Sequence, residues 1–88
     1  MATFPKQEEL IQATLQYLQS SGGRAHFKDI ERGVIKILNI DESSARLLRS
    51  GKRTELAYRL SWARTKCKES GLVTNLGSGI WEIVSKNS

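Results

Sequence analysis

Residues 54–69 read TELAYRLSWARTKCKE, a run in which apolar residues recur at the spacing of a helix. At about 100° per residue, four of them fall within one narrow arc, which predicts the buried side: Leu56, Leu60, Ala63 and Cys67. Thr54 is a favourable N-cap at the start of this helix. Because Cys67 lies in the apolar arc, we expect a small buried side chain and not a reactive thiol.

The opposite side of this helix is polar. It carries side chains suited to contacts with base edges or phosphate oxygens: Thr54, Tyr58, Ser61 and Thr65. Basic residues border the apolar arc, with Arg64 and Lys68 on one edge and Arg59 and Lys66 on the other. A polar centre between two basic edges is typical of a helix in a DNA groove, between two phosphate backbones. An amphipathic helix with cations at its boundary is the open alternative.

Positive charge is concentrated around this helix. The whole chain of 88 residues has a net charge of +5. Eight basic residues lie between positions 46 and 68, opposed there only by Glu55, so this segment carries +7: Arg46, Arg49, Lys52, Arg53, Arg59, Arg64, Lys66 and Lys68. The remaining six basic and eight acidic residues give −2. This asymmetry indicates a polyanion-binding face that includes Lys52 and Arg53, although a solvated basic helix would share it.

The first half of the chain predicts two further helices. One spans about residues 5–20, opened by Pro5 with Thr3 or Phe4 as cap, and buries an apolar stripe: Leu10, Ile11, Thr14, Leu15 and Leu18. A short extended piece over 24–27 precedes the second helix, 28–38, in which Gly33 could mark close approach of a neighbouring helix. Asp41 could cap a short helix over 42–48, whose Ala45, Leu47 and Leu48 would pack inward.

A hairpin is expected after residue 70. Leu72–Leu76 and Ile80–Val84 have the composition of strands, and the loop between them is Gly77-Ser78-Gly79. Trp81 should pack on the helices, because a lone hairpin is not stable. The order of elements predicts a mainly α, α+β winged helix-turn-helix with three main helices and a C-terminal β-hairpin wing. We expect one domain over residues 1–88, with flexible ends near 1–4 and 85–88.

Several other classes of protein are disfavoured. No apolar run approaches about 18 residues, so no membrane span is expected, and the N-terminus lacks the features of a signal peptide. The single cysteine fits a reducing compartment, here the cytoplasm. His26 has no Cys or His partner at ligand spacing, so a capping or surface role is expected and no metal site. With no phosphate-binding motif and no convergent catalytic groups, we expect no cofactor and no enzymatic activity.

A family resemblance is carried by the second half of the chain. The run RLSWART at residues 59–65, with Lys68, Ser70-Gly71-Leu72 and then Gly79-Ile80-Trp81, resembles the N-terminal domain of Mrr-type restriction endonucleases. The resemblance implies a winged-helix DNA-binding module, which in that family usually precedes a nuclease domain that cleaves modified, typically methylated, DNA. By matching position it implies backbone contacts for Arg59, Arg64 and Lys68, and structural roles for Trp62 and Trp81. From its own position off the apolar arc, Trp62 could equally pack beside the wing or stay partly exposed.

The expected partner is therefore double-stranded DNA, with a nuclease domain in cis or in trans. Residues 74–79 carry no Arg or Lys, unlike many wings, so a wing contact with DNA stays open. The polar face of the helix has no Asn, Gln or Arg for bidentate base contacts, so recognition through DNA shape or a modified base is as consistent as direct readout. A free-standing transcription regulator and a protein-interaction module are the alternative functions. The oligomeric state stays open.

Overall fold

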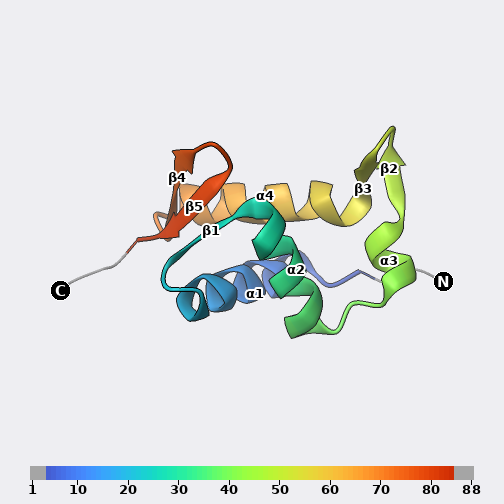
Figure 1. Cartoon of the computed structure of the whole chain (residues 1–88), viewed down its shortest axis with the longest axis horizontal. Coiled ribbons are helices and arrows are strands. Elements are labelled where there is room, and N and C mark those ends of the chain that lie inside the picture. Colours follow the sequence, from blue (N-terminus) through green and yellow to red (C-terminus); the bar gives the residue numbers. More distant parts are fainter. Residues whose placement is uncertain (1–3, 85–88) are drawn as a thin grey trace.

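The computed structural model describes residues 4–84. Four helices and five strands follow one another along these residues (Figure 1): α1 Gln7–Ser20, β1 Arg24–His26, α2 Phe27–Leu38, α3 Glu42–Arg46, β2 Leu48–Ser50, β3 Arg53–Thr54, α4 Glu55–Glu69, β4 Val73–Gly77 and β5 Ile80–Ile83. The predicted helix at 54–69 is confirmed as α4, and the C-terminal hairpin as β4–β5.

Two antiparallel sheets are present in this part of the chain. The larger has the strand order β1-β5-β4, so the short strand after α1 pairs with the second strand of the hairpin, with Ala25 opposite Trp81. The smaller consists of β2 and β3 alone. A helix followed by a hairpin that closes a three-stranded sheet with β1 is the arrangement of a winged helix, and the predicted α+β fold is confirmed.

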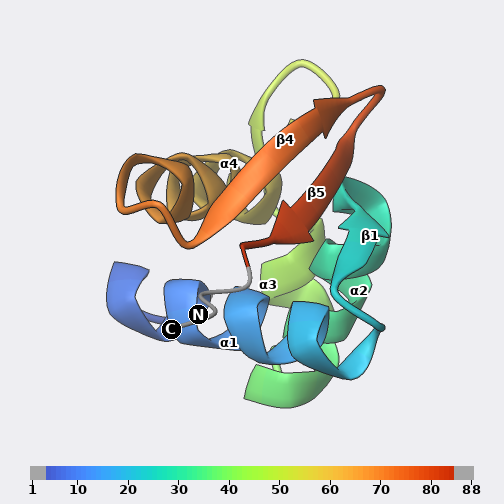
Figure 2. The ribbon, with the colours of Figure 1, turned by 90° about the vertical axis from the view of Figure 1, so that its left-hand side faces the viewer.

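The hydrophobic core lies where α1, α2 and α4 meet beneath the sheet (Figure 2). All three helices and the sheet contribute buried side chains: Leu10, Ala13 and Leu18 from α1, Ile30 and Val34 from α2, Leu56, Leu60, Ala63 and Cys67 from α4, and Val73 and Trp81 from the sheet. The apolar arc predicted for α4 is thus confirmed at each of its four positions. Trp81 anchors the wing to the helices, as expected.

The start of α1 differs from the prediction. The helix begins at Gln7 with Lys6 as its N-cap, so Pro5 precedes the first turn and Phe4 is not the cap. The reason is local, because the carboxylate of Glu9 accepts a hydrogen bond from the Lys6 amide at 2.9 Å and closes the first turn there. Phe4 is half-buried. The other residues expected to be flexible, 1–3 and 85–88, lie outside the described residues, and Thr3 is among them.

Close approach of α1 and α2 explains the glycine in the middle of α2. A Cβ atom added at Gly33 would lie 2.1 Å from Cδ1 of Tyr17, far inside contact distance. The expected helix contact at Gly33 is therefore confirmed, with the tyrosine ring of α1 occupying the space that a side chain would need.

The segment between α2 and α4 departs most from expectation. Asp41 caps α3 as predicted, but the helix ends at Arg46 and not at Leu48. Leu47 and Leu48 are 45% and 60% exposed, so the prediction that they pack inward is wrong. The chain extends instead into the β2–β3 hairpin, with its turn at Gly51 and Lys52, and neither strand was expected.

Candidate nucleic-acid interface

Local interactions fix the orientation of α4. The hydroxyl of Thr54 accepts a hydrogen bond from the Ala57 amide at 3.0 Å, which confirms Thr54 as the N-cap. Leu56 and Leu60 are completely buried, and Cys67 is 1% exposed, so one side of the helix is committed to the core. Burial raises the pKa of the Cys67 thiol, which favours the neutral form expected of a core residue.

The side away from the core is the predicted polar face, hereafter the outer face of α4 (Thr54, Tyr58, Ser61 and Thr65). Ser61 donates its hydroxyl hydrogen to the Tyr58 carbonyl at 2.7 Å, and Thr65 donates to the Ser61 carbonyl at 2.9 Å. Both hydroxyls thus use their hydrogen inside the helix. What they can offer a ligand is acceptor lone pairs, while hydrogen-bond donors must come from nearby basic side chains.

The β2–β3 hairpin brings two arginines onto this face. The guanidinium carbon of Arg49 lies 3.6 Å from the centre of the Tyr58 ring, and Arg53 donates a hydrogen bond from Nη2 to the Ser61 hydroxyl at 3.1 Å. In Figure 1 the hairpin stands at the N-terminal end of α4 and the wing beside the other end, with both tips on the side away from α1. The outer face therefore lies between two hairpins.

Glu55 organises two of the arginines near this face. Its carboxylate pairs with Arg59 at 2.7 Å and with Arg49 at 3.0 Å, and its side chain is only 16% exposed. The hydrogen bond from Arg59, followed by that from Arg49, lowers the pKa of Glu55 below its usual range. The carboxylate stays ionised near neutral pH, so it holds both guanidinium groups in place.

Most of the basic residues around α4 form no salt bridge in the part of the chain that the structure describes. Of the eight between positions 46 and 68, Arg46, Arg49 and Arg59 form salt bridges. The other five make no ion pair within residues 4–84: Lys52, Arg53, Arg64, Lys66 and Lys68. All of these except Arg64 are exposed. Unpaired exposed cations around one helix face form a surface that attracts polyanions.

Arg64 lies in a different environment from the other four. Its guanidinium carbon is 5.5 Å from the rings of both Phe27 and Trp81, and its Nε is buried with no hydrogen-bond partner in the described residues. Burial lowers the pKa of this guanidinium, opposed by the charge of Glu31. Arg64 therefore connects α4 to the start of α2 and to the wing, whereas the predicted contacts Lys52, Arg53 and Lys68 face solvent.

The wing itself offers no cation. Its described tip, residues 74–79, is uncharged, and Leu76 there is 48% exposed. The tip is set close to the start of α2, because the Phe27 amide donates to the Gly79 carbonyl at 2.9 Å and a Cβ at Gly79 would lie 2.7 Å from Nε2 of His26. His26 accepts a hydrogen bond from the Lys28 amide at 3.1 Å, so the capping role predicted for it is confirmed.

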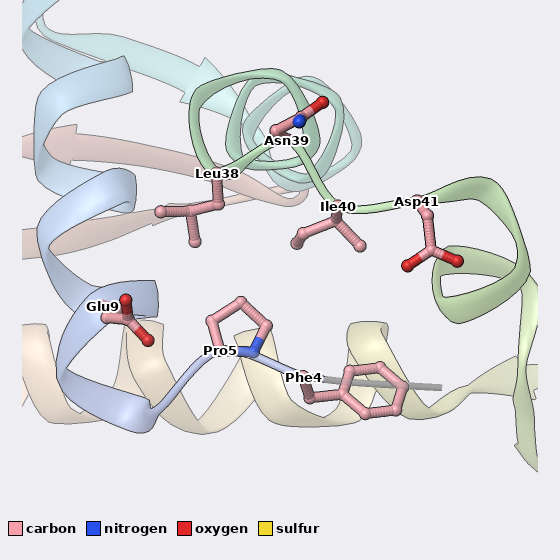
Figure 3. A pocket seen from close by; sticks show the side chains of 7 residues that line it. All are labelled: Phe4, Pro5, Glu9, Leu38, Asn39, Ile40 and Asp41. Atoms are coloured by element: carbon pink, nitrogen blue, oxygen red, sulfur yellow. The ribbon is translucent and has the colours of Figure 1, made fainter. Parts of the chain in front are cut away.

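A hollow of about 300 Å³ between the start of α1 and the end of α2 is of another kind (Figure 3). It is lined by Phe4, Pro5, Glu9, Leu38, Asn39, Ile40 and Asp41. Its two carboxylates cap helices, Glu9 at the start of α1 and Asp41 at the start of α3. Asp41 accepts hydrogen bonds from Ser43 and Ser44 that lower its pKa to about 2. Two carboxylates and no cation make this hollow unsuited to a polyanion.

Comparison with known proteins identifies the family. The sequence profile described as the Mrr N-terminal domain matches residues 8–87. This chain belongs to the Mrr N-terminal domain family. The type IV methyl-directed restriction enzyme EcoKMrr of Escherichia coli (strain K12) is 30% identical over 82 residues, which cover 90% of this chain and 26% of that enzyme. The chain thus spans about a quarter of that relative's length. No solved structure matches it.

The family assignment confirms the resemblance carried by residues 59–81. In this Mrr N-terminal domain Trp81 is buried, as the resemblance implied, but Trp62 is 49% exposed and does not support the core.

No helix within residues 4–84 is long and apolar enough to cross a membrane. Over the same residues, no three His, Cys, Asp or Glu side chains gather to hold a metal ion.

The structure also adds a residue to the candidate site of this Mrr N-terminal domain. The sequence presents Arg49 only as one of eight basic residues, yet its guanidinium stacks on Tyr58 of the outer face. The available signal was the turn at Gly51, which adopts a positive φ of 54° and places Arg49 and Arg53 on opposite strands of a hairpin.

Proposed function

We propose that this chain binds double-stranded DNA as the recognition module of a restriction system and has no catalytic activity of its own. The supporting observation is the gathering of unpaired, exposed cations around the outer face of α4, flanked by the β2–β3 hairpin. A nuclease domain, in cis or in trans, would then cleave the DNA in the cytoplasm. The match to a type IV methyl-directed restriction enzyme favours this role over that of a free-standing regulator.

In the proposed complex the outer face of α4 enters a groove. Lys52 and Arg53 from the hairpin contact phosphates at one end of the helix, and Lys68 contacts them at the other. Arg59 also contacts a phosphate, which replaces Glu55 as its partner. Arg64 holds the wing beside the helix. Tyr58, Ser61 and Thr65 face the groove floor. Because these side chains have few hydrogen-bond donors to offer the bases, they favour recognition of a modified base or of DNA shape.

The test compares binding of a random duplex by two variants with matched charge changes. Lys52→Glu with Arg53→Glu reverses two cations beside α4, and Arg32→Glu with Lys36→Glu reverses two exposed cations on α2. We expect the first variant to lose affinity at least tenfold more than the second, measured by fluorescence anisotropy at fixed salt. Equal losses would mean that binding follows net charge and not this surface. Arg64 is avoided, because its packing against Trp81 would confound the result.

A further inference from the structure

A second hollow lies at the edge of the outer face of α4. It has a volume of about 470 Å³, within the range of small-ligand sites. The side chains that matter in its lining come from α4 and the β2–β3 hairpin: Arg49, Glu55, Tyr58, Arg59, Trp62 and Lys66. It therefore adjoins the surface that we propose for duplex DNA.

An exposed indole forms one wall of this hollow. Trp62 is 49% exposed, and its ring meets the Tyr58 ring edge-on, with 6.5 Å between centroids and an interplanar angle of 77°. Arg49 covers a face of Tyr58 at 3.6 Å. A single exposed aromatic residue is ordinary on a protein surface. Trp62 differs because its indole borders a hollow and a neighbouring ring holds it at an angle.

The charges around the hollow suit an anion. Arg49, Arg59 and Lys66 are opposed by Glu55 alone, so the lining carries a formal charge of +2. Lys66 is exposed and makes no ion pair in the described part of the chain. Tyr58, Trp62 and Lys66 follow one another at four-residue spacing, which places ring, ring and cation along one stripe of the helix. An aromatic platform beside cations is the usual receptor for an unpaired nucleotide.

We propose that this hollow receives one unpaired nucleotide of the bound DNA. Its base stacks on the indole of Trp62, and its flanking phosphates lie near Arg59 and Lys66. The inference rests on the proposed DNA-binding function and adds a ligand class to it. A nucleotide displaced from the duplex at the backbone edge of α4 would reach the stripe, because the stripe borders the outer face.

The test uses the 88-residue chain and two duplexes that differ only by one extra 2-aminopurine nucleotide, unpaired at the centre of one strand. We expect the bulged duplex to bind roughly 5- to 150-fold tighter, the range for one stacked base, and its fluorescence to be quenched on binding. Trp62→Ala should abolish both the preference and the quenching while affinity for the intact duplex stays the same. Trp62→Phe should keep part of both.

Leu76→Ala provides the matched control, because Leu76 is as exposed as Trp62 but lies on the wing. It should leave the preference for the bulge intact. If the preference survives Trp62→Ala, bulge flexibility and not the hollow explains it, and the inference is wrong. Equal binding of the two duplexes by the unaltered chain would also overturn the inference alone. Binding of neither would overturn the proposed function and the inference together.

Discussion

The guanidinium of Arg49 lies 3.6 Å above the ring of Tyr58 and so fastens the β2–β3 hairpin to the outer face of α4. Glu55 holds the same guanidinium from another side, at 3.0 Å. Because the arginine is fixed by a ring and a carboxylate, the position of the hairpin depends on the first turns of α4. The two elements therefore form one surface, although they are separate in the secondary structure.

Replacing Tyr58 should loosen the hairpin. A cation–π contact at an exposed site contributes about 0.5–1 kcal/mol, and Tyr58→Leu removes the ring while keeping an apolar side chain. We expect backbone amides of residues 48–54 to exchange faster with solvent deuterium in this variant, with little change in α1 and α2. Tyr58→Phe retains the ring and should behave like the unaltered chain. Identical exchange in the Leu and Phe variants would argue against the stacking role.

Gly33→Ala should destabilise the fold although alanine is the better helix former. The gain in helix propensity is about 1 kcal/mol, but the new Cβ would lie 2.1 Å from the Tyr17 ring, and overpacking of this kind costs about 1–3 kcal/mol. Urea unfolding should show a net loss. In a Tyr17→Ala background the same substitution should cost less or become stabilising. A stabilised Gly33→Ala single variant would mean that α1 shifts freely to make room.

Thr54→Ala should remove the cap of α4 and cost about 1 kcal/mol of unfolding free energy. The Ala57 amide donates a hydrogen bond to the Thr54 hydroxyl at 3.0 Å, and this amide loses its acceptor in the variant. Thr54→Ser keeps the oxygen and should restore most of the loss. Chemical denaturation of the three proteins measures the effect, and equal stability of the Ala and Ser variants would contradict a capping role.

Acid should weaken the start of α3. Hydrogen bonds from Ser43 and Ser44 lower the pKa of Asp41 from 3.8 to about 2 in the folded chain. Stability from a lowered carboxyl pKa is fully present above the ordinary pKa and is lost as pH falls towards the folded one. The Tm advantage over Asp41→Asn should thus be constant above about pH 5 and shrink between about pH 4 and 2. An unchanged advantage at pH 2 would contradict these hydrogen bonds.

The orientation of α4 could be predicted because its evidence is local. Leu56, Leu60 and Cys67 recur with the helical period, and period alone assigns them to one side. The β2–β3 hairpin could not be predicted, because strands of three and two residues are too short to show an alternating pattern of polar and apolar side chains. Leu47 and Leu48 continue the apolar pattern of the short helix before them, which explains why they were expected in the core.

The basic residues show a second limit of sequence reasoning. A helical projection places Arg64 and Lys68 on the same edge of α4 but says nothing of what lies beside them. Phe27 and Trp81, from α2 and β5, surround Arg64 and draw it inward, whereas Lys68 stays in solvent. Partners distant in the chain decide which cations remain available to a ligand.

Salt dependence of duplex binding tests the role of the surface around α4 most directly. Each phosphate contact contributes about 0.9 to the slope of log affinity against log salt concentration. We predict that Lys52→Ala and Lys68→Ala each lower the steepness of this slope by about 0.9, while Lys36→Ala on α2 leaves it unchanged. Slopes that are the same in all four proteins, or binding that does not depend on salt, would contradict DNA binding through α4 and its hairpin.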